Sequence, residues 1–119
     1  MDSNPPIAGI PIETIRGSQT SVYIGTFNRD YVQIVERDVD NLPRYSATGL
    51  EASMVANRIS YFFDLKGPSM AIDTACSASL VSLHLACESL KSGESKMALV
   101  GGVNLMLGSH VALKMAPMG

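Results

Sequence analysis

The sequence has no tryptophan, few other aromatic residues and little charge of either sign. Aromatic residues make up 6% of its 119 residues and charged residues 17%, and 9 basic against 11 acidic side chains give a net charge of −2. Because nucleic-acid-binding domains carry a basic surface, this balance argues against a nucleic-acid partner. The hydrophobic share of 46% is too high for a disordered chain, and the length is sufficient for one small domain with a buried core.

Cysteine is also scarce, with only Cys76 and Cys87. Both fall in one predicted helix, and their spacing of eleven positions separates them by roughly 16 Å along its axis, beyond the reach of a disulfide. We therefore expect two free thiols, as in a reducing compartment. The first residues show neither a basic segment nor an apolar run, and the longest apolar stretch, residues 97–108, is too short to cross a membrane. These absences predict a cytoplasmic protein with no signal peptide and no membrane partner.

The pattern of apolar residues predicts strands that alternate with helices. Strands are expected at residues 21–27, 70–73 and 97–107, and helices at residues 29–37, 51–64 and 76–91. Irregular chain is expected at residues 1–19 and 108–119, with a turn or a short cap region at residues 46–49. This order of elements is typical of the α/β class, in which helices cover the faces of a sheet.

The longest predicted helix, residues 76–91, has one continuous apolar stripe. Its members follow helical spacing and are Cys76, Leu80, Leu83, Cys87 and Leu90. We expect Cys87, on this stripe, to be buried and inert. A second, more polar stripe is expected to face solvent, and its members are Ser77, Val81, His84, Glu88 and Lys91. Gly101 and Gly102 in the last strand are expected to permit a close approach of the backbone to this helix.

The segment Asp73-Thr-Ala-Cys-Ser-Ala-Ser79 joins a predicted strand directly to this helix. A cysteine there lies at the helix N-terminus, where backbone N–H groups are unpaired and the helix dipole is positive. Both effects favour the thiolate, which is the nucleophilic form, and the same N–H groups can bind the oxyanion that forms on an attacked carbonyl. The segment therefore indicates acyl transfer through a thioester on Cys76. The alternative is that Cys76 is a small buried apolar residue at a helix start.

The residues Gly67-Pro-Ser-Met-Ala-Ile-Asp-Thr-Ala-Cys-Ser-Ala-Ser-Leu80 resemble the active-site segment of β-ketoacyl synthases. They are most similar to the ketosynthase domains of fungal iterative reducing-type polyketide synthases. Further similar segments lie on both sides, at residues 8–13, 22–25, 45–49, 56–68, 85–94 and 98–107. Several segments in the right order are far more specific than one Thr-Ala-Cys-Ser. The resemblance predicts that residues 7–119 are part of a β-ketoacyl synthase N-terminal domain and that residues 1–6 are an unmatched lead-in.

The resemblance implies a thiolase-like α/β fold, of which this chain holds an incomplete part of the N-terminal half. It implies that Cys76 is the catalytic nucleophile, that it carries an acyl chain as a thioester, and that its backbone N–H forms part of the oxyanion hole. The implied activity is a decarboxylating condensation, that of a 3-oxoacyl synthase in polyketide or fatty-acid biosynthesis. The acyl and malonyl-type thioesters arrive on the phosphopantetheine arm of an acyl carrier protein. No cofactor or metal is expected on the chain itself, and the parent enzyme is expected to be a homodimer.

The family also uses two histidines far downstream of the nucleophile, and neither is present in this chain. His84 follows Cys76 by eight residues, roughly 12 Å along the helix axis and about 80° around it, so it cannot reach the thiol. His110 matches neither family histidine and is expected in a loop. We therefore expect the chain alone to be inactive. The alternatives are a non-catalytic truncated remnant and an interaction partner of a full-length ketosynthase.

Overall fold

Three parallel strands form the centre of the structure, a computed structural model that describes residues 9–27 and 29–118. In chain order they are β1 (Thr20–Thr26), β2 (Ser69–Ile72) and β3 (Met97–Val103). Their order in the sheet is β2-β1-β3, so that Val22 of the middle strand is aligned with Ser69 on one side and Leu99 on the other. Parallel neighbours need long crossover connections, which here contain helices. The predicted α/β class is thus confirmed.

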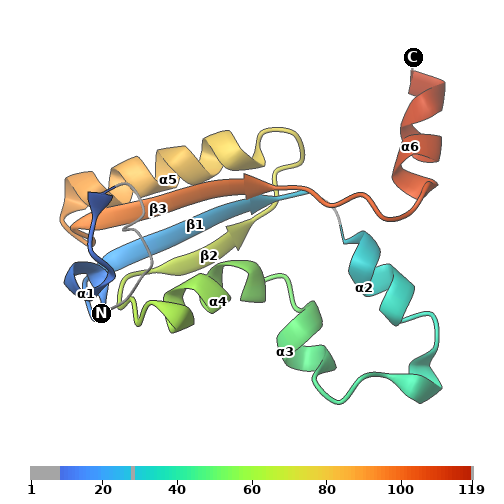
Figure 1. The fold of residues 1–119 in the computed structure, drawn as a ribbon. Coiled ribbons are helices and arrows are strands. Elements are labelled where there is room, and N and C mark those ends of the chain that lie inside the picture. The colour runs from blue at the N-terminus through green and yellow to red at the C-terminus, as the bar shows by residue number, and fades with distance from the viewer. Residues whose placement is uncertain (1–8, 28, 119) are drawn as a thin grey trace.

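Two helices cover opposite faces of this sheet (Figure 1). They are α4 (Met54–Phe62) on one face and α5 (Ala78–Ser92) on the other. Beyond the carboxyl ends of the strands lie α2 (Asp30–Val35), α3 (Ser46–Leu50) and α6 (His110–Met115), while α1 (Ile12–Ile15) precedes β1. Two short 3-10 turns, η2 (Val39–Asn41) and η3 (Ala116–Met118), complete the described elements. The described part of the chain contains no helix with the length and apolarity needed to cross a bilayer.

The largest apolar cluster lies between α4 and the middle strand. Its buried members are Val22, Ile24, Ala56 and Leu65, with Ile59, Phe63 and Leu99 packed against them. Ala56, Ile59 and Phe63 are spaced by three and four positions, which places them on one side of the helix and its C-cap. The middle strand is buried from Thr20 to Gly25, as expected for a parallel strand covered on both faces.

The first turn of α5 lies directly on the backbone of the sheet. A Cβ built on Gly25 would lie 2.6 Å from the carbonyl carbon of Ala78, and one built on Gly102 would lie 2.8 Å from the Cβ of Ser79. Such distances leave no room for a side chain on either strand residue. The expectation of a close approach to this helix is therefore confirmed for Gly102 but wrong for Gly101, where a Cβ would meet Cδ1 of Ile24 at 3.1 Å instead.

The close approach also determines which face of α5 is buried. The prediction that Cys87 is buried was wrong. The buried residues of α5 are small, namely Ala78, Ser82, Ala86 and Ser89. The large residues of the predicted stripe face away from the sheet, with exposed fractions of 69% for Leu80, 48% for Leu83 and 42% for Leu90, and Cys87 is exposed beside them. Leucine side chains do not fit where the helix and strand backbones nearly touch, so the helix turns its small residues inward.

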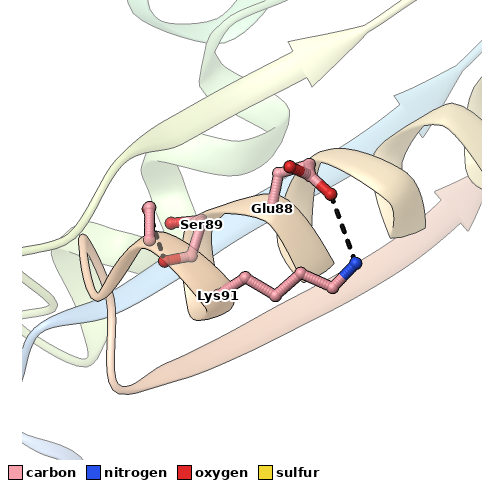
Figure 2. Close-up of polar contacts among 4 residues, drawn as sticks. Glu88, Ser89 and Lys91 are labelled. Atoms are coloured by element: carbon pink, nitrogen blue, oxygen red, sulfur yellow. Dashed lines mark hydrogen bonds and ion pairs between the residues drawn. The ribbon is translucent and has the colours of Figure 1, made fainter.

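Serine hydroxyls on the buried face have partners, so the cost of burying them is small. Ser82 Oγ donates to the carbonyl oxygen of Ala78 at 2.8 Å, and Ser89 Oγ is 2.6 Å from Ser95 Oγ. Figure 2 shows the opposite, polar surface, where Lys91 Nζ reaches Glu88 Oε1 at 3.4 Å. Both charged side chains are mostly exposed, which confirms that this part of the polar stripe faces solvent.

Several predicted boundaries shift in the structure. Residues 46–50 form a short helix where a turn or a short cap region was predicted, and residues 110–115 form one where irregular chain was predicted. Ile12–Ile15 is helical within the predicted irregular lead-in. The last strand ends at Val103 instead of residue 107 and is not fully buried, since Val100 and Val103 are exposed. The prediction for the start of the lead-in concerns residues 1–8, which lie outside the described residues.

Candidate functional site

Cys76 lies in the turn that connects β2 to α5. The helix begins at Ala78 with Ser77 as its N-cap residue, two positions later than predicted, so Cys76 directly precedes the cap. The side chain of Cys76 is exposed and its thiol is free. The alternative interpretation of Cys76 as a buried apolar residue is therefore wrong.

A short network of hydrogen bonds fixes this turn. Asp73 Oδ1 accepts a hydrogen bond from the N–H of Ala75 at 2.9 Å. Thr74 Oγ1 lies 2.9 Å from Ser77 Oγ, which itself donates to the carbonyl oxygen of Thr74 at 2.9 Å. The N–H of Ala78 donates to the carbonyl oxygen of Ala75 at 3.0 Å, which closes the turn into the helix. Four consecutive contacts thus hold the backbone on both sides of Cys76.

Ala75 adopts a left-handed backbone conformation, with φ of 57°. An L-residue with a side chain pays about 1 kcal/mol or more for this conformation, and such residues gather at functional sites. The strained residue immediately precedes Cys76. The turn therefore changes the direction of the chain sharply at the point where the thiol is presented.

The exposed thiol opens on a largely apolar groove of about 530 Å³ at the carboxyl end of the sheet. Its walls come from the ends of β1 and β3, the start of α5, and α6, and include Phe27, Cys76, Ser79, Met106, Val111 and Met115. A groove of this size and character suits an extended aliphatic chain. A second groove, of about 430 Å³ between α2, α4 and the end of β3, does not include Cys76.

Neither histidine of the chain lines the groove beside Cys76 among the residues described there. His84 is exposed on α5. His110 begins α6, so its predicted place in a loop was wrong, and its Nε2 lies 2.8 Å from Asp30 Oδ1. The site therefore brings together Cys76 and an apolar groove, but no imidazole.

Sequence reasoning missed Asp30, the first residue of α2. It is 1% exposed although charged residues are rarely buried without partners. Its Oδ2 accepts hydrogen bonds from the N–H groups of Leu107 and Gly108, both at 2.9 Å, in addition to the contact with His110. An aspartate at a helix start is common in sequences, so no local signal distinguishes this one.

Comparison with known families matches residues 7–119 to the N-terminal domain of β-ketoacyl synthases. The chain belongs to the β-ketoacyl synthase family. Within this family, its similar curated relatives are fungal highly reducing polyketide synthases, which confirms the resemblance stated above. It is 59% identical over 104 residues to a highly reducing polyketide synthase of Didymella fabae, covering 87% of this chain and 6% of the relative. It is 54% identical over 101 residues to the polyketide synthase component of lovastatin nonaketide synthase of Aspergillus terreus, covering 85% of this chain and 3% of the relative.

A similar solved structure is the ketosynthase from module 6 of the bacillaene synthase of Bacillus subtilis 168. It superposes with a TM-score of 0.80 at 38% identity, over 94% of this chain and 18% of that one. The expected thiolase-like fold is therefore confirmed, and the described elements are one part of it. The chain spans only a small fraction of the length of the relatives that it matches.

Proposed function

We propose that this chain is the nucleophile-bearing part of a ketosynthase, within the N-terminal domain at residues 7–119, and that Cys76 takes up an acyl chain as a thioester. The observation that carries the proposal is the position of Cys76. Its exposed thiol lies in a sharp turn before α5 and faces an apolar groove. The fungal relatives favour polyketide assembly as the parent activity, and fatty-acid assembly uses the same chemistry.

In the first step, the thiolate of Cys76 attacks the carbonyl carbon of an acyl thioester. A bond forms between Sγ and that carbon, the carbon–sulfur bond to the carrier breaks, and the departing carrier thiolate takes up a proton. The carbonyl oxygen is negatively charged in the intermediate, and the backbone N–H of Cys76 is the proposed donor to it. The acyl chain then lies along the groove, against Phe27 and Met115.

In the second step, a malonyl-type thioester loses carbon dioxide, and the resulting carbanion attacks the acyl group on Cys76. A carbon–carbon bond forms, the thioester bond to Cys76 breaks and Sγ leaves as the thiolate, so that the carrier holds a 3-oxoacyl chain longer by two carbons. Loss of carbon dioxide needs groups that stabilise the carbanion, for which the family uses two histidines. Because His84 and His110 both lie outside the Cys76 groove, the chain alone is not expected to carry out this step.

The proposal requires partners. The acyl and malonyl-type groups arrive on the phosphopantetheine arm of an acyl carrier protein, and the chain itself binds no further cofactor. The parent enzyme is a cytoplasmic homodimer in this proposal. The multidomain polyketide synthases among the relatives support an acyl carrier protein as the partner.

A second candidate function is a non-catalytic one, as an interaction partner of a full-length ketosynthase. Two observations favour it: no histidine lines the described groove, and the apolar side chains of α5 at Leu80, Leu83 and Leu90 are exposed. In this case Cys76 has no activated role.

Comparison of the two thiols of the chain distinguishes these functions. Cys76 and Cys87 are both exposed and free, so Cys87 is an internal control for accessibility. We expect iodoacetamide at neutral pH to label Cys76 faster than Cys87, and hexanoyl-N-acetylcysteamine to leave a hexanoyl group on Cys76 alone, both read by peptide mass spectrometry. Loss of acylation in Cys76→Ser and its retention in Cys87→Ser complete the test. Equal labelling of the two cysteines, with no acylation, contradicts the nucleophile and favours the non-catalytic function.

A further inference from the structure

A buried carboxylate joins two segments that are far apart in the chain. Asp30, at the start of α2, lies in the connection that follows β1, and its partners Leu107, Gly108 and His110 follow β3. Its side chain has no exposed surface, whereas that of His110 is 32% exposed. The imidazole Nε2 of His110 lies 2.8 Å from Asp30 Oδ1, within the distance of an ion pair. Breaking this pair leaves a buried charge with fewer donors, which is costly.

The absence of a side chain at Gly108 allows the imidazole of His110 to lie beside the carboxylate of Asp30. A Cβ at this position would lie 2.9 Å from Nδ1 and 3.2 Å from Cε1 of His110, and 3.7 Å from Oδ2 of Asp30. The imidazole ring therefore occupies the space that a side chain at position 108 would fill. A side chain at this position forces the ring to shift from its place beside Asp30, although it removes no hydrogen-bonding group.

The contact between Asp30 and His110 lies at the first residue of α6, a helix that is otherwise weakly packed. No residue of α6 is buried, and Figure 1 shows α6 standing off the carboxyl end of the sheet. The same helix supplies Val111 and Met115 to the wall of the Cys76 groove. The position of that wall relative to the thiol thus depends on the contacts at the start of α6.

We infer that Asp30 and His110 are positioning residues that hold α6 as one wall of the Cys76 groove and so determine how well an aliphatic acyl chain is bound beside the thiol. The inference rests on the proposed function of Cys76. Asp30 anchors the segment after β3 through two backbone N–H groups, and His110 ties the first residue of α6 to the same carboxylate. With this contact broken, α6 moves off the groove and the chain loses apolar contacts, while the thiol and its turn stay unchanged.

Two maleimides that differ only in their tails test the inference. The protein is the complete chain with Cys87→Ser, so that Cys76 is the single thiol. The measured quantity is the ratio of the labelling rates with N-octylmaleimide and N-methylmaleimide. Because both reagents share one reacting group, a change in the reactivity of the thiol alone cancels in this ratio. We expect the ratio to exceed one in the background chain, since the octyl tail binds in the groove.

We expect His110→Ala to lower the ratio about tenfold, which corresponds to the loss of contact with roughly two methylene groups. Gly108→Ala displaces the ring sterically and is expected to lower the ratio in the same direction. His110→Gln keeps a side-chain N–H donor at a similar reach and is expected to restore the ratio. His84→Ala removes the exposed histidine of α5 and is the matched control, with the ratio unchanged.

A ratio that stays at the background value in both His110→Ala and Gly108→Ala overturns the inference. So does a loss in His110→Ala that His110→Gln does not restore, because the polar contact with Asp30 is then not the cause. The proposed function is tested separately, by the rates of Cys76 and Cys87 with N-methylmaleimide in the unsubstituted chain. Equal rates there contradict an activated Cys76, whereas the ratio in the variants still reports on the wall of the groove.

Discussion

Gly25, near the end of β1, lies against the backbone of Ala78, the first residue of α5. A methyl group on Gly25 would lie 2.6 Å from the carbonyl carbon of Ala78 and 2.6 Å from the N atom of Ser79. Backbone atoms cannot rotate away as a side chain can, so only glycine is compatible with this contact. The contact fixes the start of α5 and, with it, the turn that carries Cys76 only two residues earlier.

We predict that Gly25→Ala destabilises the chain by about 1–3 kcal/mol, the usual cost of overpacking a tight interior. The measurement is the free energy of unfolding from urea denaturation, followed by circular dichroism. Gly49→Ala is the matched control, because a Cβ on this residue of α3 has no atom within 4 Å and alanine favours helix over glycine. Equal stability of Gly25→Ala and Gly49→Ala would show that the helix does not lie on the strand as described.

Much of the architecture could be predicted from the sequence, because it depends on local patterns. The alternation of residues 21–27 predicts β1 to within one residue, the apolar run at residues 97–107 contains β3, and the helical spacing after Cys76 matches α5. The buried face of α5 could not be predicted in this way. Periodicity identifies the stripe with the largest apolar residues as the buried face. In the structure the helix lies so close to the glycines of two strands that only small residues fit between them.

The candidate site also contains residues that could be predicted from the sequence and residues that could not. Cys76 was predictable, since a cysteine between a strand and a helix has a local signature. The contact between Asp30 and His110 was not, because its partners are 80 positions apart and neither residue type is unusual in its surroundings. The helix at His110 was also missed, since none of its residues is buried and its apolar residues follow no clear stripe.

The left-handed conformation of Ala75 gives a prediction for the turn. Glycine adopts this conformation without the steric cost that a Cβ brings, so we expect Ala75→Gly to raise the free energy of unfolding by about 0.5–1 kcal/mol. Ala75→Val, with a branched Cβ at the same φ, is expected to lower it. Urea denaturation measures both. If Ala75→Gly is the less stable variant and Ala75→Val is neutral, the turn at Cys76 is not strained in solution.

Removal of the buried carboxylate is expected to be costly. Asp30→Ala leaves the N–H groups of Leu107 and Gly108 without the oxygen that accepts them, and we predict a loss of about 2–3 kcal/mol in the free energy of unfolding. Asp38→Ala is the control. Asp38 also accepts a side-chain hydrogen bond, from Asn41 at 2.8 Å, but it is exposed, so its loss is expected to change stability by less than about 0.5 kcal/mol. Similar effects of the two substitutions contradict the anchoring role of Asp30.

The exposed face of α5 predicts how the chain behaves in solution. Leu80 and Leu83 present large apolar side chains on one helix, and exposed apolar surface of this kind promotes association and dye binding. We expect the chain to bind a hydrophobic dye and to aggregate, and we expect Leu80→Ser with Leu83→Ser to reduce both without loss of secondary structure.

A leucine on the opposite face of α5 is expected to destabilise the chain. Ser82 is fully buried against the sheet, so Ser82→Leu places a large side chain where the helix and the strands are in contact, and we expect it to unfold the chain or displace α5. Dye fluorescence, light scattering and circular dichroism on the two variants measure the contrast. If the leucine-to-serine variant loses its helix while Ser82→Leu folds, the leucine face of α5 is the buried one and the orientation of this helix described above is wrong.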